Sequence, residues 1–125
     1  MARTPFPPMP RFVIQQHDRQ DEPRHWDLLL EQGQALRTFR LDLAPADLVD
    51  RPAKALPIAD HPTRFLTYEG PVNKGLGQVA IVERGTYQTL GQGDDTWDLE
   101  LKGQTLKGRF RLTRSSADAW ELRKA

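Results

Sequence analysis

Short apolar segments recur about every ten residues along this chain, separated by glycine, proline or charged residues. Two clear examples are RFVIQQ at residues 11–16 and HWDLLLE at residues 25–31. Apolar segments of this length are typical of β-strands, and no stretch shows the 3.6-residue period of a long helix. The expected strands span residues 11–16, 25–31, 35–41, 65–68, 78–83, 86–90, 97–101, 105–113 and 119–123.

The segments between these strands carry turn and loop signals. We expect loops at residues 18–24, 51–60 and 70–77, with a short extended piece inside the second of them, a turn at Arg84-Gly85, and one helical turn at residues 46–50. About eight short antiparallel strands with at most one or two short helical turns make a mainly all-β fold, either a barrel or a sandwich.

Composition is ordinary for a soluble globular domain, with 38% hydrophobic and 28% charged residues. In a chain of 125 residues without internal repeats, we expect one domain at residues 11–125 and a flexible proline-rich arm at residues 1–10. The arm lacks the apolar stretch of a signal peptide, no segment has the length of a membrane helix, and cysteine is absent. We therefore expect a cytoplasmic monomer without membrane contact. The net charge of +1 means that nucleic-acid binding would depend on local clusters.

Candidate chemistry begins with the tripeptide His25-Trp26-Asp27. Alternate residues of a strand share one face, so His25 and Asp27 point the same way while Trp26 and the following even-numbered residues face a core. His17 ends the preceding expected strand, and antiparallel pairing would bring it near His25. Two imidazoles and one carboxylate commonly bind manganese, zinc or iron(II), so these three residues are candidate metal ligands. The alternative is a set of surface histidines beside a surface aspartate.

A second group of residues could contact a phosphate. His61 precedes Pro62, which holds the His61 backbone extended and so orients the imidazole; the alternative is an ordinary loop histidine. Arg37 and Arg40 occupy opposite faces of one expected strand, so at most one of them can point toward His25.

A basic stripe lies on the expected strand at residues 105–113, where Lys107, Arg109 and Arg111 share one face. Such a stripe is either a solvated outer face or a track for a nucleic-acid backbone.

Several motifs occur in a characteristic order along the chain. They are Phe12-Val13-Ile14-Gln15-Gln16-His17-Asp18, His25-Trp26-Asp27-Leu28-Leu29-Leu30-Glu31, Asp60-His61-Pro62, Tyr68-Glu69-Gly70, Gly75-x-Gly77, Val82-Glu83-Arg84-Gly85-Thr86-Tyr87, Leu106-Lys107-Gly108-Arg109-Phe110 and Trp120-Glu121-Leu122. In this order the motifs resemble the 3′-phosphoesterase domain of bacterial DNA ligase D, and most closely its small stand-alone relatives. The similarity covers residues 11–124.

The resemblance implies a compact antiparallel β-barrel with an active site in its hollow. It also implies an enzyme that uses manganese, with Zn²⁺ or Co²⁺ as other candidate ions, to remove a terminal ribonucleoside and then the remaining 3′-phosphate. Carried over by motif, His17, His25 and Asp27 would be the metal ligands, and His61 would contact the scissile phosphate. The implied partners are DNA or DNA–RNA 3′ ends in DNA repair, together with a DNA ligase or other end-joining proteins.

The chain departs from the family pattern around the phosphate. Leu29 stands where the family carries an arginine two residues after the aspartate, Phe65 replaces a tyrosine, and Ala59 replaces an acidic residue. We expect Arg40, on the adjacent hairpin strand, to take over as the phosphate clamp and to act in catalysis with His61.

Two other functions remain open at this point. The chain could be a catalytically impaired module that keeps the metal and recognises nucleic-acid ends, a hypothesis that Leu29 and Phe65 favour. It could also be a structural or protein-interaction barrel in which the histidines are incidental.

Overall fold

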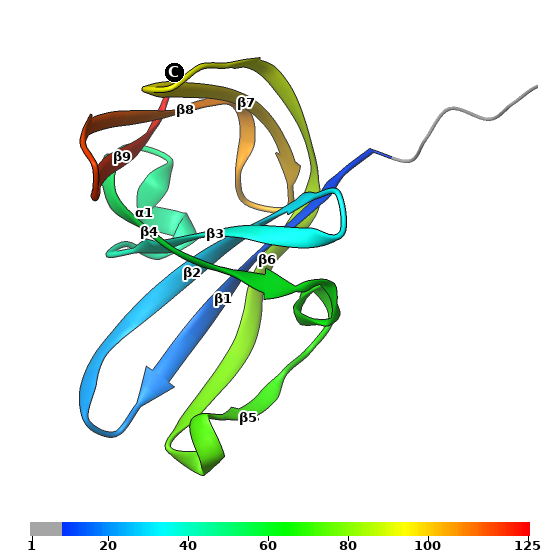
Figure 1. The fold of residues 1–125 in the computed structure, drawn as a ribbon, viewed down its shortest axis with the longest axis vertical. Helices are drawn as coiled ribbons and strands as arrows, with labels where there is room; N and C mark the ends of the chain where they lie inside the picture. Colours follow the sequence, from blue (N-terminus) through cyan, green and yellow to red (C-terminus); the bar gives the residue numbers. More distant parts are fainter. Residues whose placement is uncertain (1–8) are drawn as a thin grey trace, which may run out of the picture.

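The computed structural model describes residues 9–125 and shows an almost purely β protein (Figure 1). Its strands are β1 (Arg11–Arg19), β2 (Glu22–Gln32), β3 (Ala35–Leu41), β4 (Ala53–Pro62), β5 (Gly70–Val72), β6 (Gly77–Gln92), β7 (Thr96–Gly103), β8 (Lys107–Ser116) and β9 (Ala119–Lys124). Its helical segments are α1 (Pro45–Leu48) and the 3₁₀ helices η1 (Thr63–Leu66) and η2 (Asn73–Gly75). The prediction of a mainly all-β, antiparallel fold is confirmed. No helix in residues 9–125 is long and apolar enough to cross a membrane.

The sheet closes on itself. Its strand order is β1-β2-β3-β4-β9-β8-β7-β6-β5, and an additional β1–β6 pairing joins the two ends into a ring, with β5 outside it on β6. β6 pairs with two strands along different parts of its length: its residues 77–86 pair with β1, and its residues 85–92 pair with β7. Figure 1 shows the result, a ring of strands at the top and a lower extension in which β1, β2, β5 and β6 run on together.

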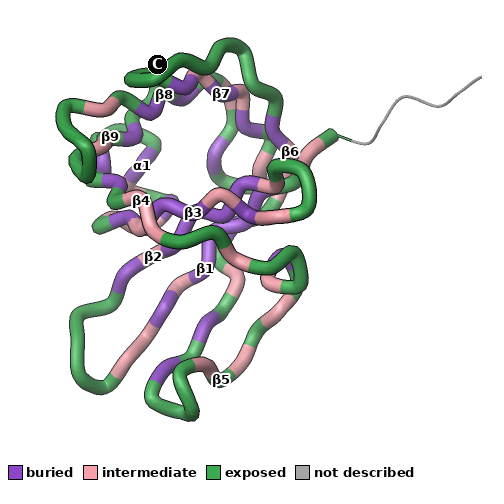
Figure 2. Tube along the Cα trace, viewed as in Figure 1, coloured by how far each residue is buried: buried purple, intermediate pink, exposed green. Residues whose placement is uncertain are grey.

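Two hydrophobic clusters cover opposite faces of β1, β2 and β3. The main core gathers alternate residues of the ring strands, among them Phe12, Ile14, Leu28, Leu30, Phe39, Trp97, Phe110 and Leu122. A smaller cluster on the other face contains Val13, Leu29, Leu36 and Leu66, with Phe65 and Ile81 packed against it. This alternation follows from the two-residue period of a strand, and it makes β1–β3 a buried partition between two layers (Figure 2).

Gly85 marks the point at which β6 passes from one partner to the other. It is paired with Phe12 of β1 and with Gly103 of β7, and a Cβ at this position would overlap the carbonyl oxygen of Lys102. The predicted turn at Arg84-Gly85 is therefore wrong, because this glycine permits the close approach of neighbouring strands rather than a chain reversal.

Three other local predictions are also wrong. Residues 18–24, expected as a loop, form the tips of β1 and β2, where ion pairs such as Arg24–Asp18 stabilise a solvated hairpin. Residues 51–60 contain β4 despite two prolines, since β4 pairs with β9 only at residues 53–55. Residues 65–68 are not a strand, because η1 covers their first two positions. Leu66 belongs to the smaller hydrophobic cluster and Phe65 packs against it. The helical turn expected at residues 46–50 is present as α1.

The predicted arm at residues 1–10 falls almost entirely outside the described residues. Of its last two positions, Pro10 accepts a hydrogen bond on its carbonyl oxygen from the Tyr87 amide at 2.9 Å. The chain is thus attached to β6 one residue before β1 begins.

Glu83 is a buried carboxylate on β6, only 1% exposed. Its Oε1 accepts hydrogen bonds from the amides of Arg84 and Gln104, both at 2.9 Å, and its Oε2 from the amides of Thr105 and Leu106, at 2.8 and 2.6 Å. Three of these donors belong to the turn between β7 and β8. The side chain therefore ties that turn to the middle of β6.

Tyr87 leads to a prediction about alkaline stability. Its hydroxyl donates to the carbonyl oxygen of Glu31 at 2.6 Å, and burial, aided by the Glu31 carboxylate, raises its pKa to about 12 from the ordinary value of 10.0. The folded state favours the neutral phenol, so this contribution is complete below pH 10 and is lost as the pH rises through 12. We expect the free energy of unfolding to fall by about 2 kcal/mol between these pH values. Urea denaturation at the two pH values should show a smaller decrease in the free energy of unfolding for Tyr87→Phe than for the unmodified protein. Equal decreases would show that Tyr87 is not the group responsible.

Candidate metal and phosphate site

A polar cavity of about 280 Å³ lies on the face of β1–β3 that is opposite the main core. It is bounded by these strands on one side and by the segment running from the end of β4 to η2 on the other. Its lining residues are Gln15, His17, Arg19, Glu22, Asp27, Arg40, Ile58, His61, Phe65, Val72, Asn73 and Val79. This cavity therefore lies outside the strand ring, because the main core fills the interior of the ring.

The cavity brings the predicted metal ligands together. His17 and His25 are directly paired across β1 and β2, and their ring centroids are 4.5 Å apart at an interplanar angle of 70°. His25 Nε2 lies 3.7 Å from Asp27 Oδ1. One potential ligand atom from each of the three residues lies within 4.8 Å of the others, and all three residues are buried. Two imidazoles and a carboxylate at this spacing are a donor set suited to a divalent transition metal.

Unpartnered polar atoms show that the donor set fits a cation. His25 Nε2 and Asp27 Oδ1 are both buried without a hydrogen-bond partner, a costly state for polar atoms unless a further group satisfies them. Burial also lowers the pKa of His17 and of His25, and this effect outweighs the nearby Asp27 carboxylate, which raises both. The imidazoles are therefore held in the neutral form that binds metal.

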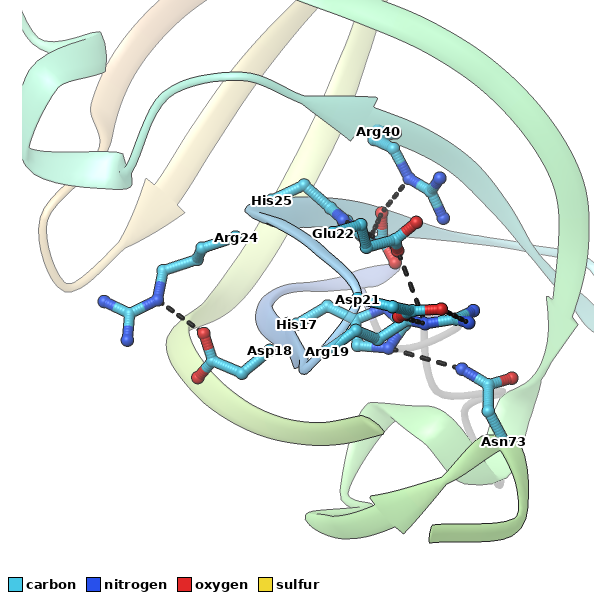
Figure 3. Close-up of polar contacts among 10 residues, drawn as sticks. His17, Asp18, Arg19, Asp21, Glu22, Arg24, His25, Arg40 and Asn73 are labelled. Atoms are coloured by element: carbon cyan, nitrogen blue, oxygen red, sulfur yellow. Dashed lines mark hydrogen bonds and ion pairs between the residues drawn. The ribbon is translucent and has the colours of Figure 1, made fainter. Parts of the chain in front are cut away.

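Three residues around the ligands were not identified from the sequence, and Figure 3 shows two of them, Glu22 and Asn73. Glu22 Oε1 lies 3.8 Å from His25 Nδ1, the nitrogen that faces away from Asp27, and Asn73 Nδ2 lies 3.5 Å from His17 Nε2. A Cβ at Gly77 would come within 2.8 Å of His17 Nε2, so a glycine there leaves room for the imidazole. The Gly75-x-Gly77 motif was the only sequence signal for this contact.

His61 lines the cavity, and the groups around its Nδ1 favour one tautomer. Its Nδ1 lies 3.0 Å from Thr38 Oγ1 and 3.1 Å from the carbonyl oxygen of Ala59. The Thr38 hydroxyl donates its hydrogen to the carbonyl of Leu36, so both neighbours of Nδ1 are acceptors. In neutral His61 the hydrogen therefore resides on Nδ1, which leaves the Nε2 lone pair for a substrate or water.

Arg40 lines the cavity, whereas Arg37 on the opposite face of the strand does not. It is paired with Asp27 across β2 and β3, and its Nε lies 3.5 Å from Asp27 Oδ1. This Nε is buried without a hydrogen-bond partner. Arg37 is not among the cavity-lining residues, and its guanidinium lies 5.0 Å from the ring centroid of Phe39 in the main core. Arg40 is thus the strand's one arginine at the site.

Two of the three departures from the family pattern, Leu29 and Phe65, have local explanations. Leu29 is fully buried in the smaller hydrophobic cluster and is not among the residues that line the cavity. Phe65 packs edge to face against His61, with ring centroids 5.4 Å apart. Its ring thus supports the His61 imidazole without offering a hydroxyl.

The basic stripe of Lys107, Arg109 and Arg111 is exposed on one face of β8, as predicted. None of the three residues lines the cavity, and Arg111 is paired with Asp98 at 2.6 Å.

The structure thus defines an all-β domain that gathers histidines, an aspartate and an arginine around one polar cavity. Comparison with known families matches residues 15–114 to the DNA ligase D 3′-phosphoesterase domain, and the chain belongs to this family.

Individual relatives agree with this match. The chain is 33% identical over 119 residues to the multifunctional non-homologous end joining protein LigD of Mycobacterium bovis. The same identity and length relate it to the multifunctional non-homologous end joining DNA repair protein LigD of Mycobacterium tuberculosis. Each alignment covers 87% of this chain but 15% of the relative.

Proposed function

We propose that this domain is a metal-dependent phosphoesterase that removes a 3′-phosphate or 3′-ribonucleotide from DNA or DNA–RNA ends in end-joining repair. The observation that carries the proposal is the convergence of His17, Asp27, His61 and Arg40 on one cavity, with His25 grouped beside His17 and Asp27, in a member of the 3′-phosphoesterase family. A DNA ligase or another end-joining protein is the proposed partner, in keeping with the names of the relatives.

His17, His25 and Asp27 would hold the ion, for which we propose manganese, with zinc or cobalt as substitutes. When bound, the ion would polarise a phosphoryl oxygen and make a water molecule more nucleophilic. Glu22, beside His25 Nδ1, would keep the other nitrogen of this imidazole directed toward Asp27.

His61 and Arg40 would act on the phosphate itself. The contacts at Nδ1 fix the His61 ring, so its Nε2 can hold or release a proton at the phosphate. Arg40 would donate N–H groups to the phosphoryl oxygens as negative charge develops on them. Its proximity to Asp27 places this donor next to the ion-binding group.

The proposal is tested by measuring phosphate release from a primer–template with a 3′-phosphate, with manganese and then with excess chelator. Release that requires the ion supports the proposal. Absence of release with manganese, zinc and cobalt would reject the enzymatic function.

Arg40→Ala should lower kcat/KM for 3′-phosphate release about 100-fold, because it removes a charged donor from the developing negative charge. Arg37→Ala is the matched control, since it removes an arginine from the same strand that lies outside the cavity. Steady-state kinetics should show the control within twofold of the unmodified protein. Equal losses in both variants would show that Arg40 acts only through the fold.

A second candidate function is a metal-binding module that recognises nucleic-acid ends without turnover. The buried Leu29 and the hydroxyl-free Phe65 favour it, because both reduce the number of groups able to bind phosphate. It predicts manganese binding and end-dependent DNA affinity with no product.

A further inference from the structure

Two arginines within residues 9–125 line the site cavity, Arg40 on β3 and Arg19 at the end of β1. We propose that Arg19 binds the terminal phosphate together with Arg40, so that two arginines on separate strands replace the one that the family pattern carries at the position of Leu29. The proposal rests on the proposed function, since it assumes that a 3′-phosphate occupies the cavity. Arg19 lies just outside the motifs that carry the family resemblance, so this contact is a feature of the present chain.

The first argument is the position of Arg19 beside the candidate metal ligands. Arg19 follows His17 by two residues on β1, and alternate residues of a strand share one face. A Cβ at Gly77 would come within 2.8 Å of His17 Nε2 and 3.0 Å of Arg19 Cγ, so both side chains lie over the same glycine. Arg19 thus places a positive charge on the wall of the cavity that contains His17.

The second argument is the direction of the side chain. Arg19 and Arg24 both lie near the tip of the β1–β2 hairpin, but Arg24 is not among the residues that line the cavity. Figure 3 shows the two side chains pointing to opposite sides of the hairpin. The Arg19 side chain is 25% exposed, whereas that of Arg24 is 55% exposed. The Arg19 guanidinium is therefore directed toward the site, and Arg24 offers a matched control.

The third argument is the set of donors that Arg19 keeps available. Its Nε and Nη2 donate to the Asp21 carboxylate at 2.9 and 2.8 Å, and this contact holds the guanidinium in place. No hydrogen bond within residues 9–125 involves its Nη1. A guanidinium can donate along more than one edge, so the edge formed by Nη1 and Nη2 can bind two phosphate oxygens while Asp21 stays in contact. A donor that is held before the ligand arrives loses less entropy on binding.

The fourth argument is the charge of the cavity. The charged residues that line it are Arg19, Arg40, Glu22 and Asp27, two positive and two negative, so their formal charges cancel. A divalent ion at the proposed site would leave an excess of two positive charges, which matches a fully ionised phosphate monoester. Without Arg19 the excess would be a single charge. Arg19 therefore completes the charge balance for a terminal phosphate.

The experiment compares two labelled primer–templates that differ only in a 3′-phosphate or a 3′-hydroxyl, using fluorescence anisotropy. The protein carries manganese and the His61→Ala substitution, so that the 3′-phosphate is not consumed. The preference for the 3′-phosphate should fall at least about tenfold when Arg19→Gln is added, because hydrogen bonds from a charged group are lost. Adding Arg24→Gln instead should change the preference less than about twofold, since an exposed ion pair contributes little. Equal losses in both variants, an unchanged preference with Arg19→Gln, or no preference before Arg19 is changed would overturn the proposal.

Two further measurements separate phosphate binding from other roles of Arg19. Arg19→Gln should leave the manganese affinity unchanged in calorimetric titration, and a weakened affinity would show that Arg19 acts through His17 rather than on the phosphate. Arg19→Lys should retain part of the preference, because it keeps the charge but loses the planar pair of donors. If the protein with His61 intact releases no phosphate, the proposed function fails, while the preference for the 3′-phosphate still decides the role of Arg19.

Discussion

Replacing His25 with alanine is expected to abolish 3′-phosphate release and to weaken manganese binding by at least about 100-fold. Loss of an outer partner of a metal ligand alone costs about 10- to 100-fold in affinity, so removal of a ligand should cost more. The change should leave the fold intact, because His25 lies on the face of β2 that is opposite the main core. Calorimetric titration measures the affinity for manganese, and a thermal unfolding scan shows whether the fold is retained.

His61→Ala is the matched variant for this experiment. His61 lies in the same cavity but is not a member of the His17, His25 and Asp27 group, so the variant should retain manganese binding and lose turnover. If His25→Ala retained manganese affinity, the three residues would not be the metal site. If it lost activity only together with cooperative unfolding, the role of His25 would be structural.

Replacing Glu83 with glutamine is expected to destabilise the fold by about 2–4 kcal/mol. The carboxylate accepts four backbone hydrogen bonds, whereas an amide would turn its NH₂ group toward some of the same N–H donors. Buried donors left without an acceptor cost about 1–3 kcal/mol, and bonds to a charged group are the stronger kind. Urea denaturation followed by tryptophan fluorescence measures the loss.

Glu121→Gln provides the control for Glu83. Glu121 is exposed on β9 and is paired only with Arg123, so its replacement should change stability by less than about 0.5 kcal/mol. A loss of similar size for Glu83→Gln would show that water or a backbone shift replaces the missing acceptor. The four backbone hydrogen bonds would then not explain why the Val82–Tyr87 motif contains Glu83.

The predictable part of the site is local in the sequence. Strand alternation places His25 and Asp27 on one face, and the expected hairpin brings His17 opposite His25, as the register confirms. The same rule predicted that only one of Arg37 and Arg40 could face the site, and in the structure Arg40 lines the cavity while Arg37 does not. These successes share one cause: each needs only the period of a strand and one short connection.

The unpredicted part depends on contacts between distant segments. Asn73 and Gly77 reach His17 only because β6 pairs with β1 across about sixty residues of sequence, and no periodicity encodes that pairing. β4 could not be predicted because Pro52 and Pro57 are ordinary loop signals, although Pro57 lies within the strand. Gly85 has the ordinary signature of a turn although it lies within a continuous strand.

The pairing of β1 with β6 also shapes the order in which the protein can be assembled. β1 and β2 can form a hairpin as soon as both are synthesised, but β1 finds its second partner only after residue 86 has been made. Until then the hairpin exposes Phe12, Ile14 and the other side chains that later fill the ring. Pairing between such distant segments is slow, and the intermediate that precedes it is prone to aggregation. Cellular chaperones and a low synthesis temperature should therefore increase the yield of folded protein.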